Sequence, residues 1–431
     1  MASACRARPS SATSSAAGQP LPRWPSVKPG CGQAMDRLEQ TPARDADAQA
    51  VRRVMAVRPH AMAVRPLSEV LADTARRVFH AGPPYRSPQD IPAPVLHSAA
   101  QAAVLEGWCA TAEEAIAALR AGAIRMASAQ AHRLLVPLAG VLSASMAVFE
   151  IADPAQSLAP VWVALNEGQA HATRLGRLDE GLLPHLRWLN GPFAAELAAC
   201  LRTPLPLLPL LAEARAQGDD CHARTVAGSQ LVAAELLQRH PGLSAEARSF
   251  LAASPAFALN LWMGAAALAA SAAEGVPGAS IVTCAGGNGA EFGIQLASRP
   301  GHWSCVPAPP PQGAVEPAWA GRQAVGALGD SAVVDFAGLG GQSLRHAPLV
   351  AQAVAASLPP DADQRPARVL AGGEAAELAR GLHATAAAAC VAAGAGPLVL
   401  IGMIDAQGLA GRIGGGVIDV PVAPFAQALA H

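Results

Sequence analysis

The sequence predicts an α+β protein of more than one domain. A chain of 431 residues is long for a single core. Apolar, strand-like runs that end in glycine turns occupy the first and last parts, while helix-like segments follow one another from about residue 175 to 275. We therefore expect a disordered extension at 1–44, an α+β domain at 45–175, a helical region at 176–275 and a second α+β domain with glycine-rich loops at 276–431.

The first α+β part is expected to alternate helices with short strands. The phrase AVRP occurs at 56–59 and again at 63–66, and each copy ends in a proline that breaks the helical period. Ser68 is a suitable N-cap, and Thr111 with Glu114 forms a capping box. The expected helices are Asp45–Met55, Ser68–Thr74, Pro94–Trp108 and Thr111–Leu119, and the expected strands are Ala61–Val64, Val136–Ser143, Met146–Ile151 and Val161–Leu165.

The rest of the chain is expected to turn from helices to strands separated by glycine turns. The Pro/Gly stretch at 306–317 predicts a linker or a surface excursion. The expected helices are Leu182–Leu189, Pro192–Leu201, Leu207–Gln217, Arg224–Gln238, Ala245–Ala253, 256–273, 347–357, 374–392 and a short final one. The expected strands are Ser280–Cys284, Glu291–Leu296, Val333–Phe336, Leu398–Ile404 and Gly416–Val420.

Composition argues against several classes of protein. A formal net charge of −1 provides no basic footprint for nucleic acid. The 8 cysteines include no C-x-x-C pair and are not spaced as a disulfide framework, which predicts reduced thiols in a cytoplasm. Residues 1–34 contain no Asp or Glu and resemble a transit peptide in composition, but they lack the apolar region of a secretory signal. We expect a disordered extension there, with Met35 as a possible true start.

Two apolar stretches are tested as membrane spans. Ala256–Ala273 is long enough for a short span, but it is mostly alanine, contains Asn260 and lacks a basic flank. Gly394–Ile404 is too short and is interrupted by Pro397. We expect both to be buried core elements, and we expect no membrane association.

The cluster GDDCH (218–222) is the densest group of reactive side chains. His222 could act as a general acid or base near neutral pH. Cys221 lies near a helix start, which could favour a low-pKa thiolate. The structural alternative is that Asp219 or Asp220 caps the following helix and that Cys221 packs inward.

Other polar groups follow strands or rigid turns. Asn166 and Glu167 end an apolar strand, and they could contact an amide or ammonium group or serve only as turn residues. Asn288 and Glu291 have the same two interpretations. His80 precedes a Gly-Pro-Pro turn and is a site candidate, whereas Arg58 and Arg65 could clamp a carboxylate or be solvated.

The glycine segments GLGGQ (338–342) and RIGGG (412–416) could present backbone N–H groups to a phosphate or carboxylate, or could be structural turns. Neither matches a P-loop or a dinucleotide-binding fingerprint. No H-E-x-x-H, no D-x-D-x-D-G and no close histidine pair occurs, so neither a metal nor another cofactor is predicted.

Taken in order, these motifs resemble the AllG/YlbE-like family, long catalogued as a domain of unknown function. They are AVRP, HAGPP (80–84), PLAGVLS (137–143), LNEG (165–168), GDDCHART (218–225), NLWM (260–263), NGAEFGI (288–294), GDSAVVDFAGLGG (329–341) and IGGG (413–416), and they cover roughly residues 45–425. The resemblance implies two unusual mixed α/β domains with a small helical one. It also implies a subunit of oxamate carbamoyltransferase, which interconverts oxalurate plus phosphate with oxamate plus carbamoyl phosphate in allantoin catabolism, beside an FdrA-like partner.

The sequence departs from the family pattern at two places. Ala129, Gln130, Ala131 and His132 stand where the family has a Cys-His-Glu-His-like cluster, and Gly287 stands where the family has arginine. The loss of these ionisable groups favours a related substrate or a degenerate subunit over unchanged chemistry.

Three functions are therefore weighed: a catalytic subunit for carbamoyl or acyl-phosphate chemistry, a non-catalytic scaffold beside an FdrA-like chain, and a stand-alone hydrolase. The first is preferred, with a small anionic metabolite as substrate, phosphate or carbamoyl phosphate among the reactants, and a homodimer as a possibility. The predicted catalytic residues are His222, Asp219, Asp220, Cys221, Glu167 and His80. The predicted substrate-binding residues are Arg65, Asn166, His132, Asn288, Glu291, Asp330, Ser331, Gly338, Gly340 and Gly341.

Overall fold

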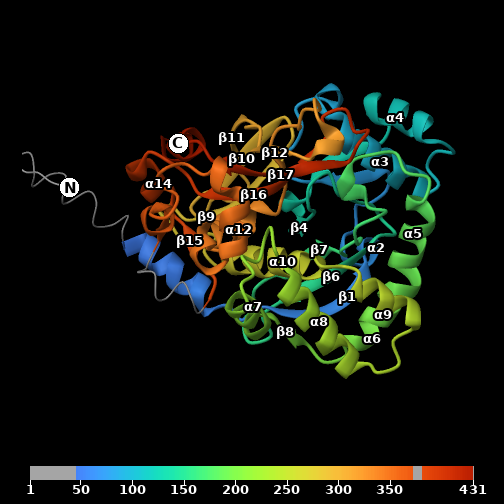
Figure 1. The fold of residues 1–431 in the computed structure, drawn as a ribbon, viewed down its shortest axis with the longest axis horizontal. Helices are drawn as coiled ribbons and strands as arrows, with labels where there is room; N and C mark the ends of the chain where they lie inside the picture. The colour runs from blue at the N-terminus through green and yellow to red at the C-terminus, as the bar shows by residue number, and fades with distance from the viewer. Residues whose placement is uncertain (1–44, 372–380, 431) are drawn as a thin grey trace, which may run out of the picture. The chain divides into compact units, whose positions relative to one another are not determined.

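A computed structural model describes residues 45–371 and 381–430 of the chain (Figure 1). These residues form helices together with mixed and antiparallel sheets, which confirms the predicted α+β class. The predicted extension at 1–44 and the start at Met35 lie outside the described residues. The proposed division at 175 and 275 stays a prediction.

The largest sheet has the strand order β4-β7-β6-β1-β8. Its core is antiparallel, because β6 pairs with both β1 and β7, while the two-residue strand β4 runs parallel to β7. The strands are β1 (His60–Pro66), β4 (Leu134–Leu135), β6 (Ala147–Ala152), β7 (Val161–Ala164) and β8 (Leu205–Pro206). The predictions for β1, β6 and β7 are confirmed within a few residues.

A second, three-stranded sheet places His80 at the end of its central strand. Strand β2 (Arg77–His80) runs parallel to β3 (Arg125–Ser128) and antiparallel to β5 (Val141–Leu142). The strand predicted at Val136–Ser143 is wrong in extent, because 136–140 form a turn in which Leu138 has a left-handed φ of 49°. Val136, at the start of this segment, hydrogen-bonds to Asp330 in the site described below.

The helices of the first part are α2 (Leu67–Val70), α3 (Ala93–Leu105) and α4 (Ala112–Arg120), preceded by the helix of residues 45–56. Helix α2 is shorter than predicted, since Leu71 already has an extended backbone and Ser68 is inside the helix rather than at its cap. The capping box predicted for α4 is present, but the Glu114 side chain binds the amide before Thr111 instead of the amide of Thr111 itself. Thr111 accepts from the Glu114 amide, and the Glu114 carboxylate accepts from the amide of Ala110.

The central helices match the predicted helical stretch. They are α5 (Leu182–Trp188), a π-helical turn (Leu189–Phe193), α6 (Ala194–Cys200), α7 (Leu207–Ala216), α8 (Val226–Arg239), α9 (Ala245–Ala252) and α10 (Phe257–Ser271). Pro192 lies inside the π-helical turn, where its missing N–H is tolerated, so α5 and α6 are joined rather than separate.

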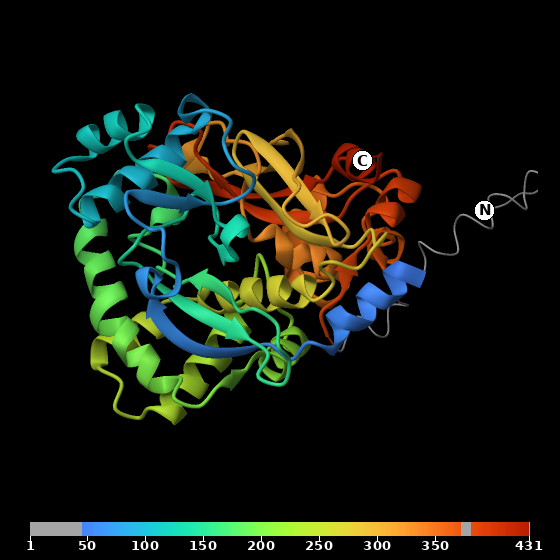
Figure 2. The ribbon, with the colours of Figure 1, turned by 180° about the vertical axis from the view of Figure 1, so that it is seen from behind.

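Helix α10 is apolar on all sides and is therefore a core helix. It packs against β6 and β7 and also against β9 and α11 (Figures 1 and 2). Among the described residues, no single helix is both long and apolar enough to cross a membrane. By length and composition alone, α9 and α10 pass that test as a pair bent by 75°.

The last part contains a four-stranded sheet, β11-β10-β9-β13, and a three-stranded sheet, β12-β17-β16. Their strands are β9 (Val282–Asn288), β10 (Glu291–Leu296), β11 (Ser304–Pro307), β13 (Leu328–Gly329), β12 (Gln312–Val315), β16 (Leu398–Ile404) and β17 (Arg412–Asp419). The remaining elements are β14 (Leu370–Ala371), β15 (Ala384–Thr385), α11 (Ala332–Phe336), α12 (Pro348–Val354), α13 (Arg365–Val369), α14 (Ala387–Ala393) and α15 (Ala423–Ala430).

Two sequence predictions are wrong in this part, and a third is matched only at its end. Val333–Phe336 is helical rather than extended, because a short apolar run suits a buried helix as well as a strand. The segment 412–416 lies in strand β17 rather than in a loop, and its glycines allow β12 to approach closely. The stretch 306–317 lies mostly at the surface, in line with the expected surface excursion, and it also contributes residues to β11 and β12. Of the helix predicted at 374–392, only its end corresponds to α14, and residues 374–380 lie outside the described residues.

Candidate functional site

His222 and Asp335 form a buried hydrogen-bonded pair. His222 lies in the turn before α8, Asp335 lies in α11, and the His222 Nδ1 is 2.6 Å from the Asp335 Oδ2. The second oxygen of Asp335 accepts hydrogen bonds from the amides of Gly341 (2.8 Å) and Leu400 (3.2 Å). A carboxylate fixed in this way selects the Nδ1–H tautomer of the neutral ring and leaves Nε2 as its second functional atom.

The electrostatic surroundings favour the protonated ring of His222. Burial lowers its pKa, but the negative charges of Asp335 and Asp220 outweigh burial and raise the pKa above its ordinary value. The side chain is 5% exposed, and within the described part of the chain Nε2 has no hydrogen-bond partner. His222 can therefore carry a proton near neutral pH and present it at Nε2.

Asp219 and Asp220 shape the turn rather than orient the imidazole. Asp220 accepts from the amides of His222, Ala223 and Arg224, and burial raises its pKa to about 6. Asp219 accepts from the Gly228 amide in the first turn of α8 and so caps that helix, as in the structural alternative. The carboxylate that orients the His222 ring is that of Asp335 and not that of Asp219 or Asp220.

Cys221 is buried and has a left-handed φ of 69°. Burial raises the pKa of its thiol far above the ordinary value, and the charge of Asp220 adds to that effect. The expected low-pKa thiolate is therefore wrong, since the thiol stays protonated at neutral pH.

Asp330 joins three segments that are distant in the sequence. Its carboxylate accepts from the Gly82 amide (2.8 Å), the Gln130 side chain (2.6 Å) and the Val136 amide (3.0 Å). Burial raises the pKa of this carboxyl to about 7 despite these hydrogen bonds. Asp330 lies two residues before α11, and Asp335 is near its end, so this cluster and the His222–Asp335 pair lie at opposite ends of one short helix.

The HAGPP turn is held against strand β9 by side-chain hydrogen bonds. The side-chain amide of Asn288 donates to the Pro83 carbonyl at 2.8 Å. Its side-chain oxygen Oδ1 accepts from the backbone amides of Ala290 and Glu291. A Cβ atom at Gly287 would lie 2.0 Å from the Ala327 carbonyl oxygen. The backbone found here therefore leaves no room for an arginine at 287.

His80 is a buried neutral histidine. Its Nδ1 donates to the Ala81 carbonyl at 2.8 Å, and burial lowers its pKa to about 4. The ring stacks on Tyr85 at 4.3 Å, and within the described part of the chain its Nε2 has no partner. An unpaired buried acceptor of this kind can receive a hydrogen bond from an amide N–H.

Asn166 and Glu167 serve mainly as turn and cap residues. Asn166 donates to the Ala256 carbonyl and to the Asn260 side chain, which fixes the strand end against α10. Glu167 accepts from the amide and hydroxyl of Thr173, and burial raises its pKa. A pocket beside it is lined in part by Pro137, Gly140, Glu167, Thr173 and Asn190.

The glycine loop at 338–342 does not offer its amides to a ligand. The Gly340 amide donates to the Asp220 carbonyl, the Gly341 amide to Asp335 and the Gly338 amide to the Asp335 carbonyl. A Cβ atom at Gly340 would lie 2.2 Å from an Asp335 oxygen. These glycines let the loop pack closely against the His222–Asp335 pair. The prediction that the backbone N–H groups of this loop bind a phosphate or carboxylate is therefore wrong.

The side chains of the other predicted site residues take no part in the hydrogen bonds described above. Arg65 is half exposed and pairs with Glu150 at 3.6 Å. His132 is half-buried, with its ring edge-on to Phe79. Glu291 forms an ion pair with Arg86. Ser331 is the N-cap of α11 but makes no side-chain cap hydrogen bond.

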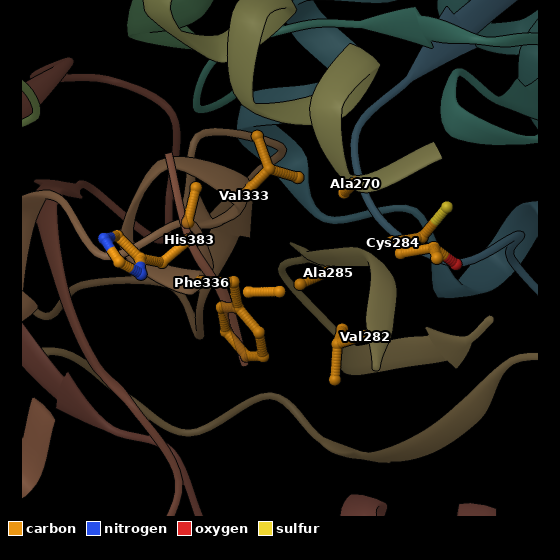
Figure 3. A pocket seen from close by; sticks show the side chains of 10 residues that line it. Ala270, Val282, Cys284, Ala285, Val333, Phe336 and His383 are labelled. Carbon is orange, nitrogen blue, oxygen red and sulfur yellow. The ribbon is translucent and has the colours of Figure 1, made fainter. Parts of the chain in front are cut away.

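A second pocket lies between β9, α10 and α11. Figure 3 shows Val333 and Phe336 of α11 close to His383, with Ala270, Val282 and Ala285 nearby. Its lining is mostly apolar and includes none of the predicted site residues. Among the residues that the structure describes, no three His, Cys, Asp or Glu side chains converge as a metal-binding group.

Sequence reasoning missed Asp335 and Gln130. Asp335 stands within GDSAVVDFAGLGG (329–341), six residues before Gly341. An acidic residue within an apolar run was the available signal, because a buried carboxylate needs several donors. Gln130 was noted only as a departure, yet it holds Asp330.

Comparisons with known proteins give a consistent similarity. The family model described as oxamate carbamoyltransferase subunit AllG matches residues 124–331, a range that includes His222 and Asp330. The chain is 28% identical to the oxamate carbamoyltransferase subunit AllG of Escherichia coli (strain K12), over 90% of this chain and 97% of that one. It is 29% identical to the uncharacterized protein YahG of the same organism, over 74% and 70% of the two chains.

A solved structure shares the fold. It is the crystal structure of a conserved protein of unknown function from Enterococcus faecalis V583, with a TM-score of 0.80 and 25% identity, covering 91% of this chain and 97% of that one. The matched family model and the near full-length similarity to AllG point in the same direction. The chain is similar to the AllG family of oxamate carbamoyltransferase subunits, which supports a carbamoyltransferase-related subunit.

Proposed function

We propose that this chain is a subunit of a carbamoyltransferase that acts on a small ureido carboxylate. The reaction is oxalurate plus phosphate to oxamate plus carbamoyl phosphate, or a close relative of it. The buried His222–Asp335 pair, with Nε2 left for a ligand, is the observation that carries the proposal. The printed description of the matching family supports the reaction class.

The proposed chemistry requires one proton to move. A phosphate oxygen attacks the carbamoyl carbon and forms a C–O bond, and the bond from that carbon to the ureido nitrogen breaks. The leaving nitrogen takes a proton from the His222 imidazolium, and the proton of the attacking hydrogen phosphate restores the imidazolium. The raised pKa of His222 keeps the acid form populated near neutral pH.

Replacement of His222 in the assembled complex tests this role. His222→Gln should lower kcat by about 10²–10⁴-fold, the usual contribution of general acid–base catalysis. His302→Gln, at an exposed histidine, is the matched control and should retain wild-type turnover. Turnover of His222→Gln within a factor of two of wild type would exclude the proposed proton transfer.

The family name refers to a subunit, so we infer that further chains complete the enzyme. An FdrA-like chain in the cytoplasm is the proposed partner, in line with the resemblance, and no cofactor enters the proposal. Co-expression with affinity capture tests the partner, and size-exclusion chromatography tests the possible homodimer.

A non-catalytic scaffold is the second candidate. Gln130, a neutral residue that holds Asp330, replaces part of an ionisable cluster and favours it. Under that proposal the complex would turn over normally when His222 is replaced.

A further inference from the structure

Arg174 is a buried cation with an incomplete set of hydrogen bonds. It lies in the 3₁₀ turn Thr173–Leu175 and is 8% exposed. Its Nη2 donates to the Gly168 carbonyl, but within the described part of the chain the buried Nε has no partner. Buried charges normally have a counter-charge or complete hydrogen bonding. The described residues therefore leave the Nε of Arg174 without a hydrogen-bond acceptor.

The nearest carboxylate is occupied elsewhere. Glu167 accepts from the amide and hydroxyl of Thr173 and from the backbone amide of Arg174, so it caps the turn rather than pairing with the guanidinium. Asp179 pairs with His171 and with the Nη2 of Arg177. The charge of Glu167 attracts Arg174, but among the described residues no carboxylate forms an ion pair with the Arg174 guanidinium.

Two further arginines lie around the same turn. Arg177 also has a buried Nε without a partner within the described residues. Arg412 begins strand β17 and is half exposed, with its Nη1 at 3.7 Å from Glu316. Burial lowers the pKa of Arg174, the negative charge of Glu167 raises it, and the positive charge of Arg412 lowers it further, in keeping with a position of Arg412 near this turn.

The strand turn that leads to Arg412 packs directly on this region. The Gly408 carbonyl accepts from His97 at 3.1 Å, and a Cβ atom at Gly411 would lie 3.5 Å from both the Leu175 Cβ and the Arg177 Cδ. The 3₁₀ turn and the start of β17 therefore form one local structure, and the pocket that includes Glu167 and Thr173 adjoins it.

We propose that Arg174, Arg177 and Arg412 form a binding site for a small oxyanion, the phosphate or the carboxylate group of the substrate. Guanidinium groups match such anions because their planar N–H donors pair with two oxygens. An anion here would supply the missing acceptor of Arg174 and offset the repulsion from Arg412. This assignment rests on the proposed function for the identity of the substrate, although anion binding can be measured without turnover.

Calorimetry on the full chain tests the site, with inorganic phosphate and oxamate as separate probes. Arg412→Gln, a change at a half-exposed side chain, should weaken binding of the preferred anion by at least about tenfold, the usual loss for a charge-assisted hydrogen bond. Arg125→Gln removes the same charge at an exposed position and should bind as wild type. The probe that loses affinity identifies which substrate group the site takes.

Arg174→Gln should abolish the same binding, and its melting temperature without ligand shows whether the variant folds. Unchanged affinity for both anions in Arg412→Gln would overturn the proposal, as would failure of the wild-type chain to bind either anion. The arginine variants are judged by anion affinity and His222→Gln by turnover, so a failed acid–base role and a failed anion site give different results.

Discussion

The carboxylate of Asp330 accepts a 2.8 Å hydrogen bond from the Gly82 amide, 248 residues earlier in the chain. The same carboxylate holds Gln130 and Val136 and is completely buried. One side chain therefore ties the HAGPP turn, the 136–140 turn and the start of α11 together.

Asp330 should make stability depend on pH. Its pKa is raised from 3.8 to about 7, so the folded state binds the proton more tightly than the unfolded state. The resulting stabilisation is complete below pH 3.8 and is lost as the pH rises through 7, a change on the order of 2–4 kcal/mol. Urea unfolding across that range should show a shallower decline for Asp330→Asn than for wild type. Asp90→Asn, an exposed control, should parallel wild type, and parallel curves for all three proteins would refute the prediction.

Asp335 should set the pH range of catalysis. Its negative charge helps to raise the pKa of His222, and a general acid loses activity as the pH rises through that pKa. In Asp335→Asn the alkaline limb of the kcat/KM profile should move to lower pH, and kcat should fall at least about tenfold. A purely structural role would lower the amount of active enzyme and leave the limb in place.

Cys221 should resist alkylation in the native protein. The reaction requires the thiolate, and burial keeps this thiol protonated. Peptide mapping after iodoacetamide treatment at pH 8 should show the half-buried Cys109 modified at least about ten times faster. Rapid modification of Cys221 with loss of activity would instead support the hydrolase that the sequence left open.

Gly287 should not tolerate a side chain. A Cβ atom there meets the Ala327 carbonyl oxygen at 2.0 Å, and this neighbour is backbone that cannot move aside cheaply. Gly287→Ala should lower the free energy of unfolding by roughly 1–3 kcal/mol. At Gly191, where nothing lies within 4 Å, the same change should cost nothing or be slightly stabilising. Equal stability of the two variants would contradict this account.

Patterns within one segment were enough to predict much of the fold. The helices around α10, the strand β10 and the capped start of α4 follow from apolar period, turn residues and caps. Val333–Phe336 was predicted wrongly because four consecutive buried residues have no distinguishable period. The short length of β4, β5 and β13 depends on partners far along the chain, which no local pattern reveals.

The site was predictable only in part. GDDCH drew attention to His222, but its orienting carboxylate comes from Asp335, 113 residues later. The sequence predicts that the amides of the 338–342 loop can bind an anion. In the structure they donate hydrogen bonds to Asp335 and Asp220 instead. Arg174 was missed because a buried, unpaired guanidinium can be recognised only after the surrounding side chains are placed.

Strand β16 contacts Asp335 of the proposed acid–base pair and Arg412 of the proposed anion site. The Leu400 amide donates to Asp335, and two residues further on Gly402 lies against the Arg412 side chain. Alternate residues of a strand are about 6.6 Å apart along its axis. Strand β16 would thereby set the spacing between the proposed proton donor and the proposed anion site. A relative that accepts a longer substrate must change side chains at either end, because pleated backbone cannot be stretched to fit.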